Sequence, residues 1–184
     1  GFGGRIYKLD LSNLRAGDQG TIPATLSHFS GVLLTNSLLL IDAGKSDFSG
    51  SELAVISLNG TKSPPVTVVR KPAPSDAKEL VLDKPPFAYS AGMYFDEPND
   101  RVFVMDANSR ELRFFSGAAL VNAYNTATTL DWSADGTLIG APGTFFTGGV
   151  AGMTPGGMLV IDGSAGFLQP GGIQIVNPRF DDPA

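Results

Sequence analysis

The stretch FDEPNDRVFVMDANSRELRFF, residues 95–115, contains two short apolar runs, each preceded by charged or turn-forming residues. The runs RVFVMD at 101–106 and ELRFF at 111–115 are rich in Val and Phe, which is typical of β-strands. The first run has four consecutive apolar residues, so both faces of its strand are expected to be buried. The stretch therefore predicts two adjoining strands inside a sheet protein.

The composition limits the class of protein. The chain has 184 residues, 42% of them apolar, which is enough for the core of a single domain over residues 1–184. The 23 glycines and 13 prolines fit many tight turns. The net charge of −5 argues against binding to nucleic acid or to an anionic membrane. The chain has no cysteine, which excludes disulfides and thiolate metal sites, and its apolar runs are too short to span a bilayer.

Short apolar runs bounded by turn residues recur along the whole chain and predict an all-β protein. The segment SGAALVNAYNTA at 116–127 is expected to be strand and loop rather than helix, because Asn122, Asn125 and Thr126 interrupt it and no capping signal leads into it. The predicted strands lie at 5–11, 31–35, 37–42, 52–58, 65–70, 92–95, 101–106, 111–115, 128–132, 137–141, 157–162 and 173–176.

The runs also repeat. VLLTNSLLLID, MYFDEPNDRVFVMD and LDWSADGTLIG each predict a hairpin that leads into an apolar strand. A further strand type recurs with an average spacing of about 50 residues, which is typical of propeller blades. The chain thus divides into four-stranded antiparallel units, about three and a half in number. Their approximate ranges are 1–25 (partial), 26–75, 76–125 and 126–178.

These hairpins resemble the blades of β-propellers of the YVTN, NHL and WD-repeat-like kind, which are widespread in bacteria. The resemblance is most specific in LDWSADGTLI and YFDEPNDRVFVMD, and no unit carries a Trp-Asp dipeptide in its third strand. Propellers close with four to eight blades. The resemblance therefore implies an incomplete part of a larger ring, expected to have six to eight blades, that is completed by another segment or another chain. The chain does not begin with Met, so a preceding segment is expected.

Several residues are candidates for a ligand or partner site. His28, the only histidine, precedes an inner strand and would face the central channel, where it could bind a metal or act as a base. The alternative is a structural role, in which the His28 side chain lies in a loop and hydrogen-bonds to the backbone. Tyr89, Ser90 and Thr128 are expected at equivalent positions in later units and would cluster with His28.

The Gly-rich stretch 142–157 lacks the Lys-Ser/Thr of a phosphate-binding loop and is interpreted as a long, mobile loop. Its Phe145, Phe146 and Met153 could contact a partner or pack against a neighbouring unit. The acidic stretches 45–52 and 95–101 could hold Ca²⁺, but their spacing differs from that of known calcium loops, so solvated turns are favoured and no cofactor is predicted. Asp42, Asp106 and Asp162, which end apolar strands, are expected to bond turn amides.

The leading interpretation is a non-catalytic propeller scaffold that binds or assembles with protein partners, outside the cytoplasm, as an extracellular or periplasmic protein. The first alternative is an enzyme of the lactonase or quinoprotein kind with a metal or cofactor on the propeller axis. The second is a structural subunit of a surface assembly that contacts its neighbour through residues 142–157. Propellers perform all three kinds of function, so the fold alone does not distinguish them, and the function has to be inferred from the residues of the site.

Overall fold

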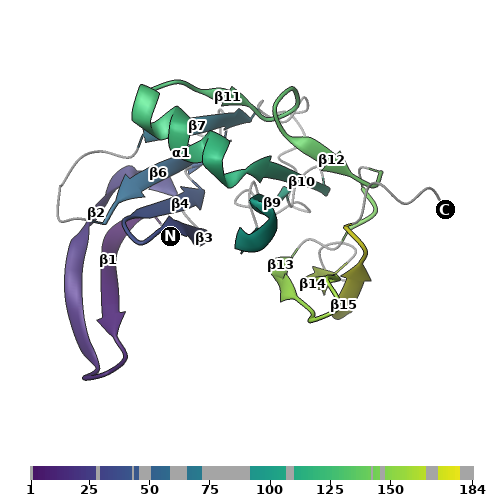
Figure 1. The fold of residues 1–184 in the computed structure, drawn as a ribbon, viewed down its shortest axis with the longest axis horizontal. Coiled ribbons are helices and arrows are strands. Elements are labelled where there is room, and N and C mark those ends of the chain that lie inside the picture. Colours follow the sequence, from purple (N-terminus) through teal and green to yellow (C-terminus); the bar gives the residue numbers. More distant parts are fainter. Residues whose placement is uncertain are drawn as a thin grey trace.

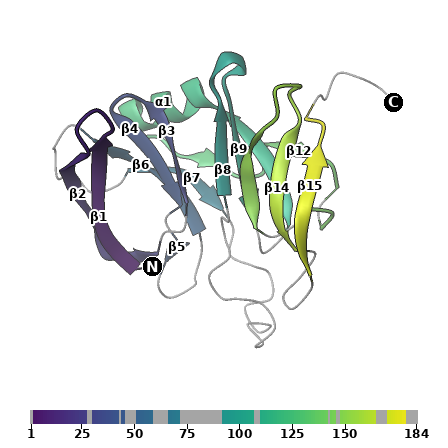
Figure 2. The same ribbon diagram turned by 90° about the horizontal axis from the view of Figure 1, so that it is seen from below.

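The computed structural model describes residues 2–27, 30–42, 44–45, 51–58, 66–71, 92–106, 110–141, 143–145, 148–164 and 170–178. In these ranges the strands form four sheets, which lie side by side in a row (Figures 1 and 2). The predicted all-β class is confirmed, although the sheets have three to five strands rather than a uniform four. Within the described ranges no helix has the length and hydropathy needed to cross a bilayer.

The sheets follow one another in chain order. Strands are antiparallel throughout, apart from the short parallel pair β7–β11. The first sheet consists of β1 (Phe2–Asp10), β2 (Arg15–Ser27) and β5 (Gly44–Lys45). The second has the order β11 (Leu130–Asp131), β7 (Val66–Lys71), β6 (Ser51–Ser57), β4 (Leu38–Asp42) and β3 (Gly31–Thr35). The third has the order β12 (Thr137–Ile139), β10 (Glu111–Ser116), β9 (Arg101–Asp106) and β8 (Gly92–Asp96), and the fourth β13 (Gly149–Met153), β14 (Leu159–Ser164) and β15 (Gly171–Val176).

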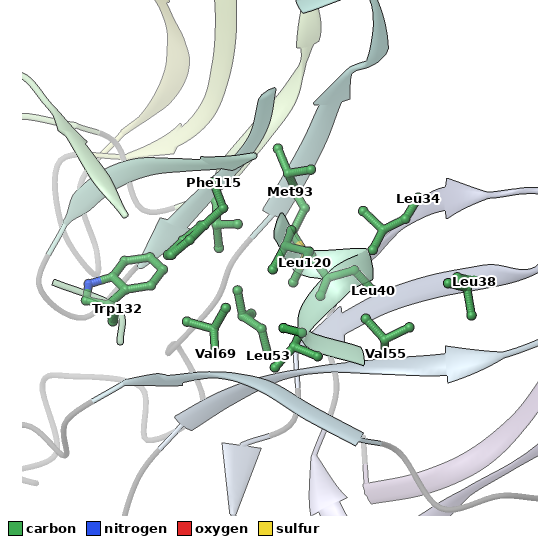
Figure 3. Packing of buried hydrophobic residues seen from close by; sticks show 14 residues of the cluster. Leu34, Leu38, Leu40, Leu53, Val55, Val69, Met93, Phe115, Leu120 and Trp132 are labelled. Carbon is green, nitrogen blue, oxygen red and sulfur yellow. The ribbon is translucent and has the colours of Figure 1, made fainter. Parts of the chain in front are cut away.

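Strand β9 explains how the row of sheets holds together. Val102 and Val104 point to one face of the third sheet and join a core shared with the second sheet. Figure 3 shows Met93 of β8 and Leu40 and Leu53 of the second sheet in this core. Phe103 and Met105 point to the other face and join a core shared with the fourth sheet. All four side chains of β9 are fully buried. Successive side chains alternate across a strand, so this apolar run fills two cores at once, as the sequence predicts.

The second sheet is likewise buried on both faces. Leu40, Leu53 and Val55 face the third sheet, and on the opposite face Ile41, Ala54 and Ile56 form a smaller core. Strand β5 of the first sheet contacts β6 on the second. Each internal sheet is thus covered by neighbours on both sides.

Segment 116–127 was predicted as strand and loop, and that prediction is wrong: Gly117–Thr126 form helix α1. Ser116 is its N-cap and accepts a hydrogen bond from the Ala119 backbone N–H at 3.1 Å. Asp100 accepts a second from the Ala118 N–H at 3.0 Å. Ser116 is thus the local N-cap signal that the prediction overlooked, and the Asp100 carboxylate, seventeen positions before the first helical residue, accepts from a second free N–H group. The helix contacts β7 and β10, and its buried Leu120 joins the core between the second and third sheets.

The predicted hairpin LDWSADGTLI does not form. Strand β11 pairs with β7 at the edge of the second sheet, whereas β12 pairs with β10 at the edge of the third. The turn between them therefore crosses from one sheet to the next. The buried Trp132 of this turn packs against Phe115 of β10 in a tilted arrangement, with ring centroids 5.6 Å apart and ring planes at 43°.

Three strands lie where the sequence predicts none. They are β2, β5 and β13. Strand β13 lies within the stretch 142–157, so the prediction of a loop is wrong for Gly149–Met153. Its sequence GVAGM has few β-branched residues, yet it pairs with β14 on both sides of an irregularity between Val150 and Gly152.

The inner strands of three sheets adjoin each other: β8 contacts β3 on one side and β13 on the other. Glycine makes the second contact possible. A Cβ placed on Gly92 would lie 2.9 Å from the Val150 backbone nitrogen and 3.0 Å from the Gly149 Cα. The third and fourth sheets can therefore approach this closely only if residue 92 has no side chain.

We expect Gly92→Ala to lower the free energy of unfolding by about 1–3 kcal/mol, because two backbones must separate to admit the methyl group. Urea denaturation would measure the loss. The matched control is Gly152→Ala, also on a strand, where an added Cβ meets no atom within 4 Å. Equal unfolding midpoints for the two variants would contradict the close packing of β8 against β13.

We expect Asp100→Ala to destabilise the protein by about 1 kcal/mol, because the start of α1 loses an acceptor for its Ala118 N–H. Asp100 also has a left-handed backbone with φ 54°, which alanine tolerates poorly. Asp100→Asn is the control, since the amide retains an acceptor oxygen and tolerates the same backbone. Thermal unfolding followed by circular dichroism should rank Asn close to the wild type and Ala below it.

Candidate interaction surface

Large apolar side chains are exposed mainly at the two ends of the row of sheets. Six of the seven in the described part of the chain belong to the first sheet, with its hairpin turn, or to the fourth sheet. They are Tyr7, Leu9, Leu11, Leu14, Ile173 and Ile175; the seventh is Leu33 on β3. These end sheets lie at opposite sides of the molecule (Figure 2). Clustered exposed apolar residues commonly mark contact sites for other proteins, so both end sheets are candidate interaction surfaces.

The fourth sheet has one buried and one open face. Leu159 and Ile161 of β14 are fully buried against the third sheet. Between them Val160 points to the other face, where it is directly opposite Ile175 of β15. Ile173 and Ile175 are 70% and 53% exposed. We call this surface, made of Val160, Ile173 and Ile175, the open face of the fourth sheet.

The first sheet ends in a hairpin whose turn is held by Asp10. The Asp10 carboxylate accepts hydrogen bonds from the backbone N–H and hydroxyl of Ser12 and from the Asn13 side-chain amide, at 2.6–2.9 Å. The Leu14 N–H donates to the Asp10 carbonyl at 2.7 Å. This network fixes residues 10–15 in one conformation, so the turn is ordered although all its side chains are exposed.

The ordered turn carries two leucines into solvent. Leu11 is 79% and Leu14 74% exposed, the largest exposures among the large apolar residues described. A shallow depression of about 680 Å³ beside them is lined by both strand ends, including Arg15 and Ala16. We call residues 9–15 the hairpin tip; it projects from the rest of the molecule (Figure 1).

The predicted site residues do not meet in one described place. His28, Tyr89, Ser90 and Phe146 lie outside the described residues. Phe145 is 5% exposed and belongs to the core between the third and fourth sheets. Met153 is half-buried and packs against the same core.

Thr128 lies just before β11, at the opposite edge of the second sheet from the inner strand β3. Its expected place beside an inner strand is therefore wrong, because β11 joined the neighbouring sheet. Its exposed hydroxyl hydrogen-bonds that of Thr126 at 2.9 Å.

Most acidic side chains with described contacts serve the fold. Asp96 accepts from the Asn99 amide, and Asp100 caps α1, so the acidic stretch after β8 closes a turn, as predicted. Buried Asp42 accepts from the backbone N–H of Ser30, the residue before β3, at 3.0 Å. Among the described residues, no three His, Cys, Asp or Glu side chains gather closely enough to hold a metal ion. Asp47, in the other candidate stretch, lies outside them.

A second polar cluster secures the crossing segment between β11 and β12. Arg113, 8% exposed, donates to the Glu111 carboxylate at 3.0 Å and to the Gly136 carbonyl at 2.7 Å. The Trp132 indole N–H donates to the same Glu111 carboxylate at 3.1 Å. These groups bind one another and the turn, so the cluster is structural.

Asp131 begins the turn of this crossing segment. The backbone N–H groups of Ala134 and Ser133 hold the pKa of its carboxyl below the ordinary value of 3.8, and Arg113 adds a smaller effect. Its stabilising effect is therefore present above pH 3.8 and is lost as the pH falls through the lowered value.

We expect an NMR titration of Asp131 to give a pKa below 3.8 that changes little between low salt and 1 M NaCl. Hydrogen bonds from the turn are insensitive to salt, whereas the field of a charge at an exposed site is screened within about 3 Å at 1 M. A return to the ordinary value at high salt would show that Arg113, and not the turn, lowers the pKa.

Sequence reasoning missed the residues that form both candidate surfaces. The run IQIV at 173–176 was predicted as a strand, and its alternation with Gly and Gln was the available signal that one face is open. The tip leucines had no such signal, because apolar residues next to a turn are common.

Comparisons of this chain with protein-family models, with curated proteins and with solved structures found no match.

Proposed function

We propose that this chain is a non-catalytic scaffold of the β-propeller type that assembles with protein partners through its two end sheets. The single observation that carries the proposal is the distribution of exposed apolar side chains. Among the described residues, six of the seven exposed large apolar side chains lie on the end sheets, whereas the second and third sheets have buried apolar residues on both faces. An additional sheet or protein on the open face of the fourth sheet would continue the same pattern of burial.

The order of strands supports the propeller part of the proposal. The second, third and fourth sheets each begin at an inner strand and proceed outward by antiparallel neighbours: β3 to β7, β8 to β10 and β13 to β15. The inner strands β3, β8 and β13 contact in sequence. Propeller blades have this arrangement, and further blades would close the ring. The edge strands β11 and β12 depart from the simple pattern, since each comes from the crossing segment.

The enzyme alternative depends on His28, which lies outside the described residues. The surface-assembly alternative shares its physical basis with the scaffold, because it also requires contact through exposed apolar surface. It would use the fourth sheet and not a loop, since Gly149–Met153 of the stretch 142–157 form β13 and Phe145 is buried in the core.

A photo-crosslinking residue, p-benzoylphenylalanine, placed at Ile175 tests the proposal. We expect irradiation to join the full chain covalently to a protein, in the purified sample or in extract of the cells that produce it. The matched control places the same residue at Leu33, an exposed aliphatic side chain on the inner strand β3. Mass spectrometry identifies the adducts. Equal labelling at both positions, or none at either, contradicts a contact at the open face.

A further inference from the structure

We propose that the partner is a second copy of this chain, bound head to tail. The hairpin tip of one copy packs on the open face of the fourth sheet of the next. This inference rests on the proposed function and names the occupant of the surface that the function requires.

The hairpin tip has two properties that favour binding to another surface, namely exposed apolar side chains and a turn held by hydrogen bonds. Its leucines Leu11 and Leu14 are exposed on a turn that Asp10 already holds in place. Binding therefore costs little conformational entropy, which favours association. A two-stranded hairpin is marginally stable in water by itself, so covering the distal part of β1 and β2 also stabilises the hairpin.

The open face of the fourth sheet is a suitable receiver. Val160, Ile173 and Ile175 present branched aliphatic side chains on a pleated surface. Elsewhere in this molecule, apolar sheet faces of the same kind are packed against a neighbouring strand pair. Docking of the hairpin continues that stacking beyond the fourth sheet.

Charge favours contact of the hairpin tip with the open face of the fourth sheet over contact between two fourth sheets. The hairpin tip carries one exposed guanidinium, Arg15, and one exposed carboxylate, Asp10, whose oxygens already accept hydrogen bonds from Ser12 and Asn13 within the turn. Residues 148–178 contain one charged side chain, the exposed Asp162, a net charge of −1. Asp162 is directly opposite Ile173 on the open face. Two fourth sheets packed together would bring two Asp162 carboxylates close, whereas the tip brings the exposed Arg15 toward one.

The two surfaces belong to opposite ends of the molecule (Figure 2). One copy cannot join its own tip to its own fourth sheet without a large rearrangement. Contact between unlike patches of identical chains is heterologous and produces either a closed ring or an open filament. The inferred assembly is therefore a ring or filament of several chains.

The cysteine-free chain allows a direct test by disulfide formation. One sample carries Leu14→Cys and the other Ile175→Cys, and the two are mixed under mild oxidation at micromolar concentration. We expect the mixed dimer in several-fold excess over either homodimer. The control pair is Leu14→Cys with Leu33→Cys, which should react no faster than random collision. A mixed dimer no more abundant than this control overturns the inference.

A double variant, Leu11→Ser with Leu14→Ser, should abolish the larger species in sedimentation velocity while leaving the circular dichroism melt nearly unchanged, because both side chains are exposed. Persistence of that species overturns the inference. Flotation with vesicles of phosphatidylcholine and phosphatidylglycerol tests whether the leucines enter a lipid surface; vesicle binding without a mixed dimer also overturns it. Adducts of Ile175 with a different protein only would retain the proposed scaffold and refute self-assembly, whereas absence of any adduct would refute the scaffold itself.

Discussion

Burial of both faces of an internal sheet is the constraint on which this structure depends. Strand β9 meets it with four consecutive apolar side chains, two for each core. A strand with one polar face could terminate the row but could not occupy its middle. The second and third sheets satisfy the constraint, whereas the first and fourth do not, and six of the seven exposed large apolar side chains among the described residues belong to these two end sheets. The candidate interaction surface is thus a direct consequence of where the row of sheets stops.

Much of the secondary structure could be predicted from local pattern. The bounds of β3 and β9 agree with the prediction to the residue, because turn residues delimit short runs of branched and aromatic side chains there. The predictions failed where the deciding contact is distant in sequence. Helix α1 depends on Asp100 for part of its cap, and the crossing segment depends on Arg70 and Arg113 of two different sheets. Strand β13 depends on its pairing with β14, since its glycines carry no strand preference of their own.

The candidate surface was less predictable than the fold. Whether an isoleucine on a strand is buried or exposed depends on whether another sheet covers that face, and alternation alone does not tell which face is covered. Ile161 and Ile173 have the same side chain on neighbouring strands, yet one is fully buried and the other 70% exposed. The predicted Phe145 illustrates the opposite case, because a phenylalanine in a Gly-rich segment proved to be part of a core.

The crossing segment also determines how the molecule should come apart under force or denaturant. Its two ends are paired to different sheets, at Val69–Leu130 and at Leu112–Ile139, and α1 lies across the same junction. The crossing segment thereby joins the second and third sheets into one cooperative unit. The fourth sheet, by contrast, packs against the third through side chains and the close backbone approach at Gly92. Unfolding should begin in the first and fourth sheets, at the ends of the row. The second and third sheets, joined by the crossing segment, would then be the last part of the native structure to unfold.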